Sequence, residues 1–166
     1  MDNEHTYQKT IPGARLTRDR EAIVWSATLS VKDARNGLDP AGIDQLLIED
    51  AVYEGQGVAE PIVGRSEIMA YFEERFSFLR NLSKERDTGK LLPARIDLPH
   101  AAAYPCLVFI AEGKRQALWV VSPDDSGRIR RIDILTVTPR PDEAELEPDT
   151  DGVQGRGNCN GPVPNE

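Results

Sequence analysis

The sequence predicts an α+β fold in which helices come first and a curved antiparallel meander follows. Apolar residues recur at helical spacing in the first half of the chain. Runs of β-favouring residues separated by turn residues fill most of the second half. Because the helical and strand segments are segregated, a βαβ fold is not indicated. With 166 residues, the chain is long enough for one domain with a substantial core.

Capping residues predict two helices near the start. Thr17 is a good N-cap, and the carboxylates of the next turn favour the positive end of a helix dipole. Asn36 and Gly37 supply a stop for this helix. Asp39 and Pro40 repeat the start pattern, so a short second helix should follow. The residues at helical spacing in the first helix are Ala22, Trp25 and Leu29.

A strand and a third helix are predicted within DAVYEGQGVAEPIVGRSEIMAYFEERF, residues 50–76. Residues 50–54 are rich in β-formers, and Gly55 and Gly57 end the run. Pro61 and Gly64 break the chain again before a helix that begins at Ser66. One face of that helix is apolar and should contact the core. Its apolar residues are Ile68, Met69, Phe72, Phe76 and Leu79.

Four further strands are predicted in residues 92–98, 106–112, 116–122 and 128–138. Glu112 and Gly113 lie at a hairpin turn between the second and third of these, and residues 123–127 form another turn. After Pro139 the chain is acidic, rich in proline and glycine, and almost without large apolar residues. Such a composition cannot offset the entropy of ordering. We therefore expect a flexible arm over residues 1–16, a domain over 17–139 and a disordered acidic tail over 140–166.

Composition excludes several classes of function. The net charge of −8 and the lack of a basic run argue against a nucleic-acid surface. The first ten residues lack the basic and apolar regions of a signal peptide, and no stretch is apolar enough to span a membrane. We therefore expect a cytoplasmic protein. Cys106 and Cys159 show neither a disulfide framework nor metal-ligand spacing.

The order of elements resembles the nuclear transport factor 2-like superfamily, which includes the SnoaL-like cyclases and ketosteroid isomerase. DAVY at residues 50–53, GRSEI at 64–68 and GRIRRIDILTVTP at 127–139 carry the resemblance, which covers residues 17–139. It implies a cone-shaped curved antiparallel sheet packed on the N-terminal helices and enclosing a pocket. It also implies a homodimer through the outer sheet face. The fold alone does not define a function, because it serves many chemistries.

The chemistry of the isomerase is not supported by the residues at the matching positions. That mechanism needs a carboxylate base just after the first strand and an acid deep in the pocket that apolar surroundings keep neutral. The resemblance places Gly55 at the position of the base and Trp119 near the position of the acid. Glu54 could supply a carboxylate if a bulge shifted the register. Without a bulge, strand alternation turns Glu54 to the solvent.

Asp133 and His100 are the remaining acid–base candidates. If residues 132, 134 and 136 line the concave face, Asp133 and its neighbour Arg131 share the outer face, where a charge pair is the ordinary expectation. A register slip by one residue would turn the pair into the pocket. There it could activate a water, as the epoxide hydrolases of this superfamily do. His100 lies in a loop before a strong strand, and histidine is the side-chain type whose unperturbed pKa is nearest to neutrality.

Neither a nucleophile elbow nor a phosphate-binding glycine loop is present, and acids and histidines are not clustered at metal-ligand spacing. We therefore expect no cofactor and no metal. Large apolar side chains at helical or strand spacing usually only fill the core. They could instead converge as the wall of one pocket, with Tyr53 as its polar group. The predicted pocket-lining residues are Trp25, Tyr53, Phe72, Phe76, Trp119 and Ile134.

Three functions remain open at this point. The leading hypothesis is a protein that binds a small apolar molecule in its cone without strong catalytic machinery. The alternative is a cofactor-independent SnoaL-like isomerase, cyclase or hydrolase that uses Asp133, Glu54 or His100. An interaction module that acts through the outer sheet face is the third.

Overall fold

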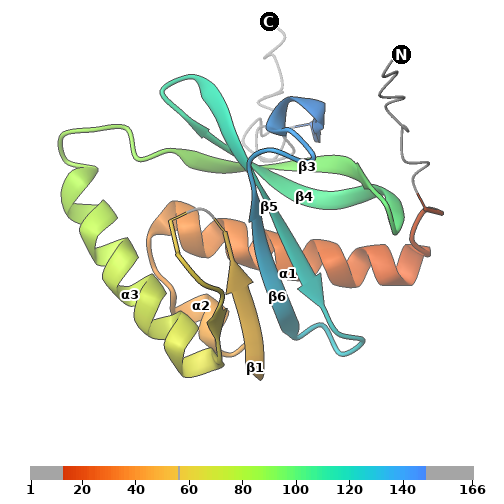
Figure 1. Cartoon of the computed structure of the whole chain (residues 1–166), viewed down its shortest axis with the longest axis horizontal. Coiled ribbons are helices and arrows are strands. Elements are labelled where there is room, and N and C mark those ends of the chain that lie inside the picture. The colour runs from red at the N-terminus through yellow and green to blue at the C-terminus, as the bar shows by residue number, and fades with distance from the viewer. Residues whose placement is uncertain (1–12, 56, 149–166) are drawn as a thin grey trace, which may run out of the picture.

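The computed structural model describes residues 13–55 and 57–148, and they form the expected α+β arrangement (Figure 1). The helices are α1 (Arg18–Gly37), α2 (Ala41–Asp44), α3 (Arg65–Leu82) and the 3-10 helix η1 (Pro141–Glu143). The strands are β1 (Leu47–Glu54), β2 (Ile62–Val63), β3 (Lys90–Leu98), β4 (Ala101–Ala111), β5 (Lys114–Pro123), β6 (Ile129–Leu135) and β7 (Glu145–Leu146). They form one sheet in the order β2-β1-β6-β5-β4-β3-β7. Only the β1–β6 pair among these strands is parallel.

Helix α3 packs on β1 with the face that its sequence predicts. Its buried residues are Ile68, Met69, Phe72, Phe76 and Leu79. All five residues of the predicted apolar face are buried, because α3 packs on the sheet with one side only and its polar residues remain at the surface. Gly64 precedes the helix with a φ of 106°, a backbone conformation that favours glycine.

Helix α1 buries a different face from the one predicted. Ala22 and Leu29 are exposed, and Trp25 is only partly buried. The buried residues are Val24, Ala27, Thr28, Val31, Ala34 and Arg35. Val24, Ala27, Val31 and Ala34 of this stripe are themselves at helical spacing, but the prediction followed the larger side chains of Trp25 and Leu29. Figure 1 shows α1 crossing behind β5 and β6, and it contacts β3, β4 and β5.

The sheet bends strongly, and register shifts accompany the bend. They occur between Phe109 and Ile110 in the β4–β5 pair and between Ser122 and Pro123 in the β5–β6 pair. Bulges of this kind increase the local twist and bend the strand that carries them. The predicted turn between β4 and β5 is a two-residue hairpin, with φ values of 53° at Glu112 and 73° at Gly113.

Residues 140–148 are ordered, which corrects the prediction of a disordered tail from residue 140. They form η1 and β7, and β7 pairs with β3 and so becomes the edge strand of the sheet. Arg115 donates hydrogen bonds to the carbonyl oxygens of Pro141 at 3.3 Å and Ala144 at 2.8 Å. These contacts are to backbone groups, so order here does not require the apolar side chains that the composition lacks. The rest of the predicted tail, 149–166, lies outside the described residues.

The predicted N-terminal arm also needs a correction at its end. Arg15 forms a parallel bridge to Ala102, and the Ala102 amide donates to the Ala14 carbonyl at 3.3 Å. Residues 1–12 of the arm lie outside the described part of the chain.

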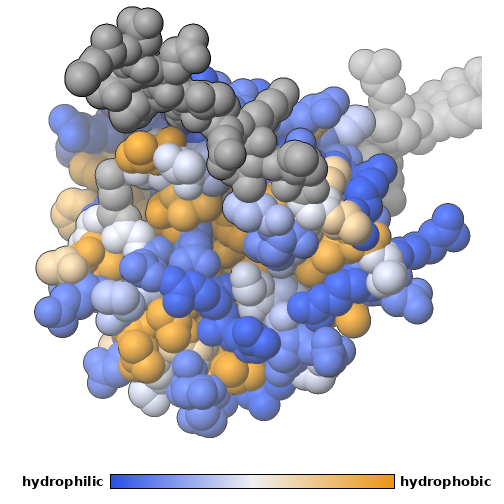
Figure 2. Space-filling view, turned by 45° about the vertical axis from the view of Figure 1, so that its right-hand side comes forward, coloured by the Kyte–Doolittle hydropathy of each residue, from blue (hydrophilic) through white to orange (hydrophobic). Residues whose placement is uncertain are grey.

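The outer face of the sheet carries a second apolar cluster. Val108, Leu118 and Val120 are at most 5% exposed, and Ala144 of the C-terminal segment packs in the same cluster. On the face shown in Figure 2, apolar residues form patches interspersed with hydrophilic residues. Within the described residues, no helix is long and apolar enough to cross a membrane.

Candidate functional site

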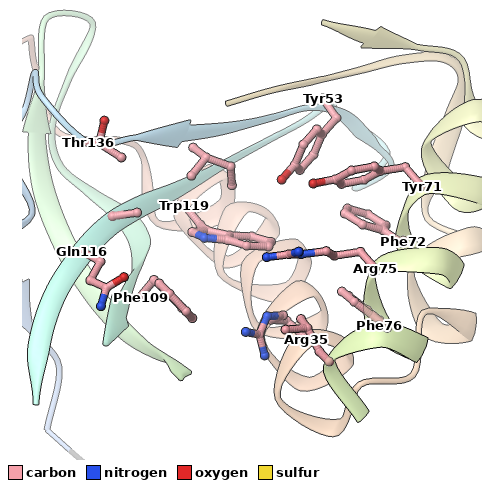
Figure 3. Close-up of a pocket in the computed structure, with 13 residues that line it drawn as sticks. Arg35, Tyr53, Tyr71, Phe72, Arg75, Phe76, Phe109, Gln116, Trp119 and Thr136 are labelled. Carbon is pink, nitrogen blue, oxygen red and sulfur yellow. The ribbon is translucent and has the colours of Figure 1, made fainter. Parts of the chain in front are cut away.

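A cavity of about 240 Å³ lies between α3, the end of α1 and the inner face of the sheet (Figure 3). It is lined by Arg35, Tyr53, Tyr71, Phe72, Arg75, Phe76, Leu79, Phe109, Gln116, Ala117, Trp119, Ile134 and Thr136. The hollow of a curved sheet closed by helices is a usual place for a ligand pocket, because the strands bring side chains from distant parts of the chain to one wall.

Aromatic rings form most of this wall. Tyr53 lies 5.3 Å from Tyr71 and 5.3 Å from Phe72, measured between ring centroids. The rings of Phe72 and Phe76 stack at 5.3 Å, and Trp119 lies 6.5 Å from Tyr53 on the opposite side. Because β1, α3 and β5 supply these rings, the wall surrounds the cavity from three directions.

The two tyrosines bring their hydroxyl groups together. Figure 3 shows the oxygen atoms of Tyr53 and Tyr71 pointing toward each other at one end of the cavity. Burial is the main cause that raises the pKa of the Tyr53 phenol, and the neighbouring Tyr71 raises it further. Tyr53 is therefore a neutral hydrogen-bonding group at physiological pH.

Two arginines also reach the cavity. Arg35 comes from the last turn of α1 and is 4% exposed. Arg75 comes from α3 and is exposed, and its guanidinium carbon also lies 5.6 Å from the centroid of the Phe78 ring. The Arg35 guanidinium donates a 2.6 Å hydrogen bond from Nη2 to the Thr88 carbonyl. It also lies 5.2 Å from the centroid of the Phe109 ring. Burial, and after it the charge of Arg75, lowers the pKa of Arg35.

Five of the six residues predicted to line a pocket lie on the cavity wall: Tyr53, Phe72, Phe76, Trp119 and Ile134. Trp25 does not line this cavity. Its ring is partly buried and lies 5.2 Å from the guanidinium carbon of Arg95.

The three acid–base candidates lie away from this cavity. Glu54 and Asp133 are neighbours across the β1–β6 pair on the outer face, where both bind Arg131. Arg131 Nε donates to Asp133 at 2.9 Å from Oδ1 and 3.0 Å from Oδ2. Burial raises the pKa of Asp133, and the charge of Arg131 opposes that shift. His100 is exposed in the turn before β4, 5.4 Å from the ring of Tyr104.

A second hollow, wider and more open, touches the outer pair of carboxylates. Its volume is about 660 Å³, and Glu54, Gly55, Pro61 and Asp133 are among its lining residues. Because both carboxylates already bind Arg131, one of their two negative charges is offset before any molecule enters the hollow.

Gly55 has no room for a larger side chain. A Cβ atom built there would lie 2.5 Å from the Cβ of Ile134, so the space for an isomerase-type carboxylate is already filled. Trp119, the residue near the expected position of the deep acid, lines the cavity with its ring. Among the described residues, His, Cys, Asp and Glu side chains nowhere gather in a group of three that could hold a metal ion.

Sequence reasoning missed the two cavity arginines. Arg35 continues the series Val24, Thr28, Val31 at intervals of four and three residues, the spacing of the buried face of α1. The spacing can be read from the sequence, but arginine is rarely buried, so the position does not stand out as part of the core. Arg75 stands at the same spacing in the series Ile68, Phe72, Leu79 on the buried face of α3, although Arg75 itself is exposed.

No protein-family model matches the sequence, and no curated protein matches it. Solved structures do share its fold. A nuclear transport factor 2-like protein of unknown function from Mesorhizobium loti is 14% identical, with a TM-score of 0.51, and the match covers 82% of this chain and 99% of that one. A SnoaL-like protein of unknown function from Burkholderia thailandensis is 13% identical, with a TM-score of 0.51, and the match covers 80% and 99%.

A steroid delta-isomerase from Pseudomonas aeruginosa is also similar, with 15% identity, a TM-score of 0.47 and coverage of 80% of this chain and 85% of that one. Identities this low concern the fold alone. The likeness to the Mesorhizobium and Burkholderia structures agrees with the helix order and the curled sheet described above. This chain has the nuclear transport factor 2-like cone fold.

Proposed function

We propose that this protein binds a small, largely apolar molecule in the cavity between α3 and the inner face of the sheet. The observation that carries the proposal is the convergence of aromatic rings on one open space of about 240 Å³. A core that served only for stability would fill such a space, because buried side chains pack to the density of organic crystals. An apolar cavity of about 150 Å³ in another protein binds benzene. The cavity here therefore suits a molecule of one or two rings.

The placement of the titratable groups supports binding rather than acid–base catalysis in this cavity. Glu54, His100 and Asp133 do not line it, and its two tyrosines and two arginines are poor general bases near neutral pH. Burial raises the pKa of Tyr53 still further above neutral pH. The polar groups present can orient a ligand through hydrogen bonds, which is the usual role of a few polar groups in an apolar pocket.

Native mass spectrometry of the full chain with a neutral one-ring probe tests the proposal. We expect wild-type protein incubated with excess cyclohexanecarboxamide to retain one probe molecule per chain. Ala117→Trp should abolish the adduct, because Ala117 lines the cavity and is 6% exposed, so that an indole there fills the space.

Ala22→Trp is the matched control, since Ala22 is exposed on α1 and does not line the cavity. This variant should bind the probe as the wild type does. An adduct that survives equally in Ala117→Trp would place the probe elsewhere and overturn the proposal. The absence of any adduct on the wild type would overturn it as well.

A further inference from the structure

The cavity wall is unbalanced in charge. Arg35 and Arg75 are its two ionisable groups that carry charge at neutral pH, and neither an aspartate nor a glutamate is among the lining residues. Figure 3 shows both guanidinium groups directed into the space beside Trp119 and Phe109. Two positive charges therefore face one small apolar space.

Arg35 is incompletely bonded for a residue that is so deeply buried. The Thr88 carbonyl accepts one hydrogen bond from its Nη2, and the face of the guanidinium lies against Phe109. No carboxylate of the described residues pairs with Arg35 or Arg75. Because an arginine stays protonated in proteins, the cost of burying this charge is met only in part, by one carbonyl and by the negative end of the α1 dipole.

Some other arginines of the same chain are paired with carboxylates. Three arginines outside the cavity each bind two carboxylates: Arg65 binds Asp44 and Glu49, Arg95 binds Glu21 and Glu147, and Arg131 binds Glu54 and Asp133. The chain has 28 acidic residues against 20 basic ones, so carboxylates are not scarce. The two arginines that face the cavity are thus left with free donors in the place where a ligand would lie.

An anion in the cavity would reduce two unfavourable energies: that of the unsatisfied guanidinium donors and that of the repulsion between the two arginines. It would accept hydrogen bonds from guanidinium N–H groups that have no other acceptor, and it would offset the repulsion between Arg35 and Arg75. Charge-assisted hydrogen bonds from arginine to a carboxylate are among the strongest in proteins, and the planar guanidinium matches the carboxylate in shape. The aromatic rings around the arginines leave room only for an apolar body beside that group.

We propose that the natural ligand is a carboxylic acid with an apolar ring body, whose carboxylate lies between Arg35 and Arg75. This inference rests on the proposed function, because it names the chemical class of the molecule in the same cavity. The ring body packs against Phe72, Phe76 and Trp119, which line the remaining wall.

Isothermal titration calorimetry of the full chain with three probes of the same ring tests the inference. The probes are cyclohexanecarboxylate, its neutral analogue cyclohexanecarboxamide and the cation cyclohexylmethylammonium. The carboxylate should bind at least about ten-fold more tightly than the amide, and the cation more weakly than both. An amide that binds as tightly as the carboxylate would overturn the inference and leave the proposed function standing. If none of the three probes binds, both proposals fail.

Arginine variants separate direct contact from a general effect of charge. Arg75→Met should weaken carboxylate binding about ten-fold or more and weaken amide binding by a clearly smaller factor, because a neutral carbonyl accepts a weaker hydrogen bond from the guanidinium than a carboxylate does. Arg86→Met removes the same charge at an exposed position outside the cavity and should change neither affinity. Arg35→Met should act as Arg75→Met does, and amide binding that is retained shows that the cavity has kept its shape. Equal losses for carboxylate and amide in Arg75→Met would overturn the inference.

Discussion

Two consecutive residues at the end of α1 have different roles. Arg35 faces the cavity, whereas Asn36 connects the helix to the sheet. The Asn36 side chain donates to the Leu91 carbonyl at 3.0 Å and accepts from the Leu91 amide at 2.8 Å. It thereby pairs with β3 as a neighbouring strand would. The same contact fixes the segment that carries Thr88, the hydrogen-bond partner of Arg35.

Asn36→Ala should lower the free energy of unfolding by about 1 to 2 kcal/mol, because both backbone groups of Leu91 lose a partner in a partly buried place. Urea denaturation measures the change. Asn81→Ala, at an exposed position near the end of α3, is the control and should be close to neutral. Similar losses in both variants would contradict the role assigned to Asn36.

Thr28 gives a prediction of opposite sign. Its hydroxyl oxygen is buried and has no hydrogen-bond partner among the described residues. Thr28→Val replaces the hydroxyl by a methyl group of similar shape, so the free energy of unfolding should rise by about 1 kcal/mol. Thr28→Ser keeps the hydroxyl, removes the methyl group and should be destabilising. A loss of stability in Thr28→Val would show that the hydroxyl has a partner.

At the scale of elements, both α1 and α3 were predicted from the sequence, but only for α3 was the buried face predicted correctly. The buried face of α3 contains only apolar residues, and periodicity finds it directly. The buried face of α1 contains Thr28 and Arg35, while Trp25 lies on Arg95 near the surface. Val24, Ala27, Val31 and Ala34 carry the correct apolar spacing, but the larger Trp25 and Leu29 favoured the wrong face. That choice left out Arg35, the residue that distinguishes the cavity.

The order of the C-terminal segment was also beyond the reach of composition. The Glu147 amide donates to the Pro93 carbonyl at 2.9 Å, and the Glu147 side chain pairs with Arg95. These contacts join a polar segment to the edge of a sheet through backbone groups and charge. Because composition measures apolar content, it indicated disorder for a segment that is held in another way.

Arg115 anchors this segment, so Arg115→Met should loosen it. We expect a loss of about 1 to 2 kcal/mol in the free energy of unfolding, since the partly buried carbonyl groups of Pro141 and Ala144 lose a charged hydrogen-bond donor. Amide hydrogen exchange in residues 140–147 should be faster than in the wild type. Lys114→Met, at the exposed neighbouring position, is the control. Unchanged exchange in Arg115→Met would contradict the anchoring role.

At the scale of the whole molecule, the homodimer and the cytoplasmic location stay predictions. Most apolar residues of the outer sheet face are already buried within one chain. Leu92 and Leu146 are the large apolar residues that remain exposed there, at 38% and 37%. Both lie on the same face as Ala94, since Leu146 pairs with Ala94 and Leu92 is two residues before it. They would form the centre of a contact between two outer faces.

Sedimentation velocity tests that assembly. We predict a dimer for the wild type and a monomer for Leu92→Glu, because a carboxylate at the centre of the contact is left without a partner. Val63→Glu introduces the same charge at an exposed position on β2, far along the sheet order from β3, and should remain dimeric. A monomeric wild type at micromolar concentration would contradict the predicted dimer.

The central claim, that the cavity takes up a small molecule, is tested most directly by the fluorescence of Trp119. The chain has two tryptophans, and only Trp119 lines the cavity. In Trp25→Phe, the emission of Trp119 should shift and saturate as cyclohexanecarboxylate is added, because the probe does not absorb where tryptophan is excited. In Trp119→Phe, the emission of Trp25 should stay constant. If the emission of Trp119 does not respond at any probe concentration up to the millimolar range, the account is contradicted.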